Sequence, residues 1–223
     1  MIAAVVFDLD GVLVDSEAAW DTARRELVHE QGGRWTDSAT LDMLGMSSLE
    51  WSRYVADELG VRLPPEEIST RVVEQLLAAY RSELPLFPGA VQAVQRLAAR
   101  WPLGLASSSN PEVIELVLSE SGLDRSFTAW VSSTDIGPGK PAPDVYLEAV
   151  RRLGAEAGDC VAIEDSENGI KSAHAAGLRV IAIPNPEFPP DRDALALADH
   201  IADSLDALTP RLVEGLDAEA HSA

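Results

Sequence analysis

Short, uninterrupted apolar runs that stop at polar residues, each followed by a longer amphipathic stretch, are the feature that most constrains this sequence. Such runs are typical of strands buried on both faces, as in a parallel sheet covered by helices. We expect five strands, at residues 2–7, 103–106, 129–131, 160–163 and 179–183. The pattern therefore predicts an α/β fold with a doubly wound (Rossmann-like) parallel sheet.

The segments between these runs have apolar residues at helical spacing. Asn110 followed by Pro111 is typical of a helix start, and Gly122 is typical of a helix end. Residues 145–153 and 170–176 have the same kind of pattern, and each is followed by a glycine. We expect these helices to cover the sheet.

The alternation of strands and helices is interrupted once, after the first strand. No strand pattern occurs between Asp15 and Leu84. The run Ser47-Ser48-Leu49-Glu50 predicts a capping box at the start of one helix in this region. Apolar residues at helical spacing predict three helices, within residues 17–30, 47–59 and 64–80.

We therefore expect two domains. Residues 1–15 and 83–223 would form the α/β catalytic core, and residues 16–82 would form an inserted, all-helical cap. The last residues, 217–223, are small and polar, and we expect them to fray.

Charge and composition argue against several classes of protein. Lys and Arg total 17 against 37 Asp and Glu, a formal net charge of −20, so neither nucleic acid nor an anionic membrane is an expected partner. The single cysteine, Cys160, excludes an internal disulfide and a multi-cysteine metal site. No apolar run approaches the roughly 20 residues of a membrane helix, and the first residues do not resemble a signal peptide. We expect a cytoplasmic protein, as a monomer or weak homodimer.

Acidic and hydroxyl side chains follow three of the expected strands. Asp8 and Asp10 follow the first, Ser107 follows the second, and Glu164 and Asp165 follow the fourth. Because the carboxyl ends of parallel strands lie at one edge of a sheet, we expect these residues to converge. Clustered carboxylates need a cation, a proton or a phosphoryl group to balance them, and hard oxygen ligands suit Mg²⁺.

A cation and further hydroxyls are expected at the same edge. Lys140 lies in the run Gly-Lys-Pro-Ala-Pro-Asp, whose two prolines stiffen the loop, and a compact ammonium suits a phosphate. Ser107 and Ser108 precede the helix start at Asn110 and are placed to bind phosphate. Taken alone, a serine-rich turn is more often structural.

Together these motifs resemble the haloacid dehalogenase-like hydrolase superfamily, in the branch with a helical cap after the first strand. The similarity is greatest to the beta-phosphoglucomutase-like phosphatases, and it extends from Val5 to about Leu208. The matching stretches are FDLDGVLVDS at residues 7–16, LASSSN at 105–110, GKPAPD at 139–144 and IEDS at 163–166.

The resemblance implies a role for each residue of these motifs. Asp8 would be the nucleophile that forms an aspartyl-phosphate, and Asp10 would be the general acid and then the base for water. Ser107, Ser108 and Lys140 would bind the phosphoryl oxygens.

It also implies a Mg²⁺ cofactor. Asp8, the backbone carbonyl of Asp10, and Asp165 would hold the ion, with Glu164 as a direct or indirect ligand.

The resemblance weakens in the cap. Sugar-phosphate mutases resemble one another in a histidine on the first cap helix, and Trp20 occupies that position here. They also share an arginine in the cap loop, which is absent from the aligned loop of this chain. Arg53 follows one helical turn later. The residues expected to line the substrate pocket are Trp20, Gly45, Met46, Trp51 and Asn110. Packing within the cap is an equally open interpretation of the tryptophans and Met46.

These features predict a Mg²⁺-dependent phosphatase acting on a small phosphomonoester, a sugar or polyol phosphate. A phosphosugar mutase of the beta-phosphoglucomutase type is the first alternative. A phospho-accepting receiver module is the second, although receivers lack a large helical insertion. A haloacid dehalogenase is disfavoured, because that chemistry needs neither Mg²⁺ nor an acid at the position of Asp10.

Overall fold

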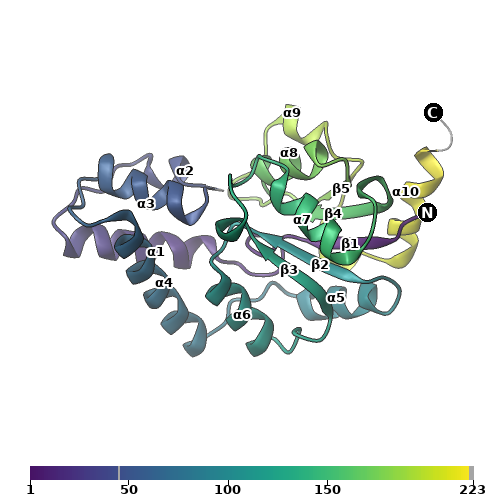
Figure 1. Ribbon diagram of the computed structural model, residues 1–223, viewed down its shortest axis with the longest axis horizontal. Coiled ribbons are helices and arrows are strands. Elements are labelled where there is room, and N and C mark those ends of the chain that lie inside the picture. The colour runs from purple at the N-terminus through teal and green to yellow at the C-terminus, as the bar shows by residue number, and fades with distance from the viewer. Residues whose placement is uncertain (45, 221–223) are drawn as a thin grey trace.

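Six parallel strands form the centre of the molecule in this computed structural model, which describes residues 1–44 and 46–220 (Figure 1). Their order is β3-β2-β1-β4-β5-β6, so the first strand lies inside the sheet. The strands are β1 (Ala4–Phe7), β2 (Leu103–Ser107), β3 (Phe127–Ser132), β4 (Cys160–Glu164), β5 (Arg179–Ala182) and β6 (His200–Ile201). The first five lie where the apolar runs predicted them.

Helices cover both faces of this sheet, which explains why its strands are apolar throughout. Val5 and Phe7 of β1 belong to one hydrophobic cluster, and Ala4 and Val6 belong to another on the opposite face. The doubly wound α/β fold predicted from the sequence is confirmed. The helices of this part are α5 (Ala90–Ala98), α6 (Pro111–Glu120), α7 (Asp144–Leu153), α8 (Glu167–Ala175), α9 (Arg192–Leu195) and α10 (Pro210–Ala220).

The register of the central strands decides which residues share the carboxyl edge. Phe7 of β1 pairs with Leu105 of β2 and with Ile163 of β4. The next residues along the chain, including Asp8 and Glu164, therefore emerge at the same edge.

Four helices occupy the stretch between β1 and α5, and we call them the helical segment. They gather at one end of the molecule, on the left of Figure 1, where α1 and α3 pack on α4. Ser47 and Glu50 form the predicted capping box. The helices are α1 (Glu17–Glu30), α2 (Ala39–Asp42), α3 (Ser48–Asp57) and α4 (Pro65–Ser82). Helix α2 was not predicted, because four residues are too few to show a period.

The chain enters and leaves the helical segment through two hydrogen-bonded stretches. The Asp15 amide donates to the Pro85 carbonyl at 2.8 Å, and the Phe87 amide donates to the Leu13 carbonyl at 3.0 Å. The division into core and cap domains stays a prediction.

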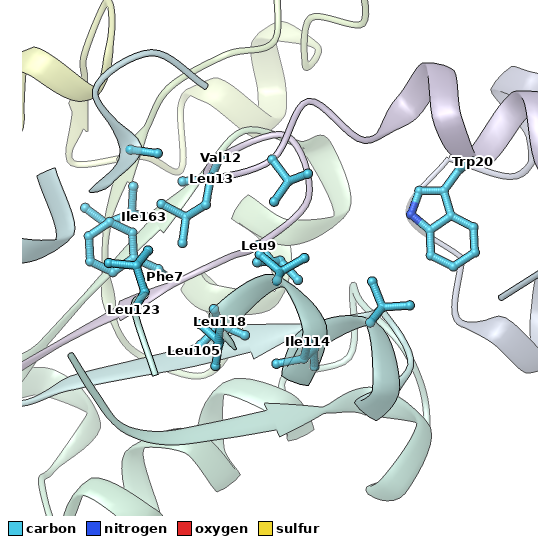
Figure 2. Close-up of a cluster of buried hydrophobic side chains, with 14 of the residues drawn as sticks. Phe7, Leu9, Val12, Leu13, Trp20, Leu105, Ile114, Leu118, Leu123 and Ile163 are labelled. Atoms are coloured by element: carbon cyan, nitrogen blue, oxygen red, sulfur yellow. The ribbon is translucent and has the colours of Figure 1, made fainter. Parts of the chain in front are cut away.

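One hydrophobic cluster includes residues of both the sheet and the helical segment. Figure 2 shows Phe7, Leu13 and Ile163 gathered beside the strands, with Trp20 set apart on α1. Helix α4 also packs against α6, so the helical segment contacts the sheet's own helices.

The C-terminal part differs from expectation. Helix α10 continues to Ala220, so the prediction of fraying from Asp217 is wrong for the described residues. The Asp217 carboxylate accepts hydrogen bonds from the Ile2 amide at 2.9 Å and from Arg179 at 2.7 Å, which ties the helix to the sheet. Strand β6 was also missed, because it has only two residues. None of the helices in the described part is long and apolar enough to cross a membrane.

Candidate active site

The residues predicted to carry chemistry meet at the carboxyl edge of the sheet. Asp8 follows β1, Ser107 ends β2, and Glu164 and Asp165 lie at the end of β4. Lys140 reaches the same place from the loop before α7, and its peptide bond to Pro141 is cis.

Lys140 is buried between two carboxylates. Its Nζ lies 2.8 Å from Asp8 Oδ1 and donates a hydrogen bond to Glu164 Oε1 at 2.6 Å. Burial lowers the pKa of Lys140, but the charges of Asp8 and Glu164 outweigh burial and raise that pKa above its ordinary value. The ammonium therefore stays charged in this site.

Three carboxylates form a cluster that suits a metal ion. One oxygen each of Asp8, Glu164 and Asp165 lie within 4.8 Å of one another, and all three residues are buried. Burial, together with the charge of Glu164, raises the pKa of Asp8 to about 8, although Lys140 opposes the shift. The same two causes raise the pKa of Asp165 well above its ordinary value. The cluster thus contains more negative charge than Lys140 balances.

Two glycines leave the space that these carboxylates occupy. A Cβ atom on Gly11 would lie 1.9 Å from Asp165 Oδ2, and Gly11 has a φ of +77° that disfavours other residues. A Cβ atom on Gly169 would lie 1.9 Å from Glu164 Oε2. Replacement of either glycine by alanine would displace an acid of the cluster.

Both oxygens of Glu164 are already hydrogen-bonded by the protein. Oε1 accepts from Lys140 and from the Tyr146 hydroxyl, each at 2.6 Å, and Oε2 accepts from the Asp165 amide at 3.2 Å and from Ser166 at 3.3 Å. Asp165 Oδ1, in contrast, is buried and has no hydrogen-bond partner among the described residues. Of these two neighbouring acids, Asp165 therefore has the unfilled capacity for a ligand.

Asp10 is held by donors from both sides of the cavity. Its Oδ1 accepts from Trp20 Nε1 at 3.2 Å, and its Oδ2 accepts from the Ser109 hydroxyl at 2.7 Å and the Ser107 hydroxyl at 3.3 Å. These contacts fix the orientation of the carboxyl group two residues after Asp8.

The neighbouring serines are placed differently. Ser107 is fully buried at the end of β2, and its Oγ accepts from the Ser109 amide at 2.9 Å in addition to donating to Asp10. Ser108 lines the cavity, and its Oγ has no hydrogen-bond partner among the described residues. Of the two expected phosphate contacts, the structure brings the side chain of Ser108, and not that of Ser107, to the cavity.

A cavity of about 80 Å³ lies between the sheet edge and the helical segment. The sheet side contributes Asp8, Asp10, Ser108, Ser109, Lys140 and Asp165, and the helical segment contributes Glu17, Trp20, Arg24, Met46, Ser48 and Trp51. Asn185 and Phe188, after β5, also line it. A concave site lined by a few charged groups and aromatic rings is typical of small-molecule binding.

The expected pocket residues have mixed outcomes. Trp20, Met46 and Trp51 line the cavity as expected. Asn110 does not line it, because its side-chain oxygen accepts a hydrogen bond from Ser48. Gly45 lies outside the described residues.

Arg24 is the cavity cation that sequence reasoning missed. Its side chain is buried, and its guanidinium carbon lies 5.0 Å from the Trp20 ring centroid and 4.9 Å from that of Trp51. It makes no hydrogen bond or ion pair with any described residue, and its Nε is buried without a partner. Burial lowers the pKa of Arg24 to about 10, against the opposing charge of Glu17.

Glu17 is a second residue of the cavity that sequence reasoning missed. Burial raises the pKa of Glu17 to about 7, although the charge of Arg24 opposes this. Glu17, Trp20 and Arg24 are spaced i, i+3, i+7, which places them on one face of α1. Because Trp20 was expected in the pocket, this spacing was the available signal for the other two.

Comparison with known proteins agrees with the motifs. Hexitol phosphatase B of Escherichia coli (strain K12) is 35% identical over 217 residues, which cover 94% of this chain and 96% of that protein. A bifunctional riboflavin kinase/FMN phosphatase of Arabidopsis thaliana is 29% identical over 205 residues, 91% of this chain, and the chain spans only 53% of its length. A crystal structure of beta-phosphoglucomutase from Clostridium difficile has the same fold, with a TM-score of 0.85 at 21% identity over 100% of both chains.

The family model for haloacid dehalogenase-like hydrolases matches residues 2–177, which include all four motifs. The predicted resemblance is thereby confirmed, and with it the prediction of a hydrolase. On this basis, the chain belongs to the haloacid dehalogenase-like hydrolase family.

Proposed function

We propose that this enzyme is a Mg²⁺-dependent phosphatase that hydrolyses a small sugar or polyol phosphate through an aspartyl-phosphate on Asp8. The observation that carries the proposal is the buried contact of 2.8 Å between Asp8 Oδ1 and Lys140 Nζ at the wall of the cavity. A carboxylate can approach a phosphate dianion only where positive charge offsets their repulsion, and this contact supplies part of that charge.

In the first step, a carboxylate oxygen of Asp8 forms a bond to phosphorus while the bond from phosphorus to the ester oxygen breaks. The leaving oxygen takes the electron pair of that bond and receives a proton from Asp10. Lys140 stabilises the negative charge on the phosphoryl oxygens during the transfer. The covalent intermediate divides one difficult displacement into two easier ones.

In the second step, the ionised Asp10 accepts a proton from water while the water oxygen bonds to phosphorus. The bond from phosphorus to Asp8 breaks, and inorganic phosphate is released. Ser109 supports both states of Asp10, because its hydroxyl donates to the ionised carboxylate and can accept from the protonated acid. Trp20 keeps the other oxygen in place.

The residues present fit a Mg²⁺ ion. Asp165 Oδ1 is buried without a partner among the described residues, and Gly11 leaves room beside it. We assign the ligands as Asp8, Asp165 and the backbone carbonyl of Asp10, whereas Glu164 orients Lys140 and the Asp165 amide. When bound, the ion adds positive charge that lowers the repulsion between the phosphoryl oxygens and the carboxylates.

The phosphoryl oxygens are held by Lys140 and Ser108. Ser108 has an unpartnered hydroxyl at the cavity wall, and this is the reason to assign the contact to it instead of to the buried Ser107.

The helical segment acts as the cap over this site. Residues 16–82 form the cap domain, and residues 1–15 and 83–223 form the catalytic core in this proposal. The adjacent entry and exit stretches, at Asp15 and Pro85, provide a hinge. Closure of a cap that lines half of the cavity would exclude bulk water from the phosphoryl transfer.

A phosphatase is favoured over the two alternatives. Hexitol phosphatase B, a relative that matches nearly the full chain, supports a sugar or polyol phosphate as substrate. Membership in a hydrolase family disfavours a receiver module. Arg53, which could have replaced the arginine typical of mutases, is exposed and does not line the cavity. The cytoplasmic location and the oligomeric state stay predictions.

The test is a screen of phosphorylated sugars and polyols for released phosphate, with Mg²⁺ in excess. We expect many turnovers per chain on at least one compound, loss of activity in EDTA, and recovery on addition of Mg²⁺. Release of about one phosphate per chain, or activity unaffected by EDTA, would contradict the proposal. A parallel assay of a sugar 1-phosphate with a sugar bisphosphate primer would detect an isomerised product if the enzyme were a mutase.

A further inference from the structure

Arg24 is the charged group in the cavity that the proposed mechanism does not use. It comes from α1, on the wall opposite the carboxyl edge of the sheet. Only 8% of the residue is exposed, and Arg24 lines the cavity.

A buried guanidinium without an ion pair is unusual, because an unpaired charge in a protein interior is costly. No carboxylate among the described residues lies within 4.0 Å of Arg24, although the charges of Glu17, Asp10 and Asp21 act on it from farther away. The next residue, Arg25, pairs with Asp21 at 2.8 Å on the outer face of the same helix. Asp21 therefore pairs with Arg25, and Arg24 has no ion pair among the described residues.

Two tryptophans hold the guanidinium in place. The rings of Trp20 and Trp51 lie 6.0 Å apart at 60°, and Arg24 lies about 5 Å from each ring centroid. Stacking on aromatic faces stabilises the cation but leaves its N–H groups free to donate. The site is thus preorganised around a set of unused donors.

Helix α1 fixes the position of these donors relative to the reacting end of the substrate. Trp20 donates to Asp10, so the first part of the helix lies beside the leaving oxygen. Arg24 follows Trp20 by four residues, which is about 6 Å along the helix axis. We infer that its donors lie beyond Asp10, towards the far end of a bound molecule.

We propose that Arg24 binds an anionic oxygen group at the end of the substrate opposite the phosphoryl group. This proposal rests on the proposed function and sharpens it, because it assigns the preferred substrate as a sugar or polyol phosphate that carries a second negative charge. A planar guanidinium matches the paired oxygens of a carboxylate or a second phosphate. Binding of either would pair the buried charge.

Three compounds that differ only at the far end test this assignment. D-mannitol 1-phosphate has a neutral far end, D-mannonate 6-phosphate has a carboxylate there, and D-mannitol 1,6-bisphosphate has a second phosphate. We expect kcat/KM of the wild-type enzyme to be about 10- to 100-fold higher for at least one anionic probe, mainly through a lower KM, as for one charged hydrogen-bonded contact. The probe that responds identifies a carboxylate or a phosphate as the ligand.

Substitutions in α1 test whether the preference for anionic probes depends on Arg24. Arg24→Gln should reduce the ratio of kcat/KM between the anionic and neutral probes to about one, and Arg24→Lys should keep part of it. Arg25→Gln is the matched control, because Arg25 pairs on the outer face, and it should leave the ratio unchanged. Thermal melting of each variant monitors the fold.

The outcomes separate this proposal from the proposed function. A wild-type ratio near one, or a ratio that Arg24→Gln leaves unchanged, would overturn the role of Arg24 while hydrolysis itself continues. If Arg24→Gln does not fold, the wild-type ratio and Arg24→Lys still decide the question. If the wild-type enzyme hydrolyses neither these probes nor p-nitrophenyl phosphate in Mg²⁺, the proposed function fails and this inference fails with it.

Discussion

The two walls of the cavity surround their cations with different groups: carboxylates around Lys140 and aromatic rings around Arg24. On the sheet side, Lys140 lies between Asp8 and Glu164 at 2.8 and 2.6 Å. On the helical side, Arg24 lies over two aromatic rings and has no ion pair among the described residues. In the proposed function, the first wall is preorganised for one chemical step, and the second has donors left to bind the far end of the substrate.

One hydrogen bond joins the two walls. Trp20 donates to Asp10 from α1, and the ring of the same residue contacts Arg24. The proposed proton transfer at Asp10 and the proposed recognition at Arg24 therefore both depend on the placement of Trp20.

The largest expected effect is on the sheet side. Asp8→Asn should lower kcat by at least about 10⁴-fold, because an amide cannot replace the carboxylate nucleophile. The amide has nearly the same shape, so the fold should be retained. Steady-state kinetics and circular dichroism would measure the two effects, and substantial turnover by a folded variant would exclude Asp8 as nucleophile.

Asp10→Asn tests the residue at the border between the walls. We expect a loss of about 10²- to 10⁴-fold in kcat/KM on an alkyl phosphate, because its leaving oxygen needs a proton. The loss on p-nitrophenyl phosphate should be much smaller, because that leaving group departs as a stable anion. An equal loss on both compounds would contradict the role of Asp10 as general acid.

A matched pair of stability measurements compares the two cations directly. Lys140→Met should lower the free energy of unfolding by about 3–5 kcal/mol, because it leaves Asp8 and Glu164 buried without their partner. Arg24→Met should change it by no more than about 1 kcal/mol, because only contacts with aromatic rings are lost. Chemical denaturation of the metal-free proteins measures both, and a reversed order would break the comparison.

A smaller effect than that of Lys140→Met is expected in the pH dependence that Glu17 contributes on the helical side. Burial raises its pKa in the folded protein to about 7 from an ordinary 4.5, so folding favours the protonated acid. The stabilisation is fully present below pH 4.5 and is lost as the pH rises through 7. Glu17→Gln should therefore match the wild type below pH 4.5 and exceed its free energy of unfolding by about 1–3 kcal/mol above pH 7.

Denaturation at pH 4 and pH 8 gives that difference. A difference that does not change between the two pH values would mean that Glu17 has similar surroundings in the folded and unfolded chain.

The sheet and its acidic edge could be predicted because their signals are strong and local. Continuous apolar runs identify strands buried on both faces, and the polar residues after Phe7 and Ile163 identify the edge where ligands bind. Short elements gave no such signal: α2 has four residues and β6 has two. Helix α10 was missed because its contacts, such as that of Asp217 with Ile2, join parts of the chain that only folding brings together.

Within the site, the details that the sequence does not show depend on side-chain direction. Strand β2 continues to Ser107, one residue beyond the predicted end, so Ser107 is still in the strand and its hydroxyl is buried instead of facing the cavity. Arg24 has no motif of its own, because one arginine among helical residues is normally a solvated side chain. Its unpaired state becomes visible only when Trp51, from another helix, is placed against it.

The position of β1 inside the sheet has a consequence for synthesis. Its hydrogen-bonding neighbours are β2 and β4, and β4 ends at Glu164. During translation, the apolar Ala4–Phe7 strand therefore emerges before both neighbours, and it cannot pair with β4 until Glu164 has left the ribosome. A nascent chain halted before Cys160 would expose one side of that strand, which makes it a natural target for chaperones, and Asp8 would still be without Glu164 and Asp165.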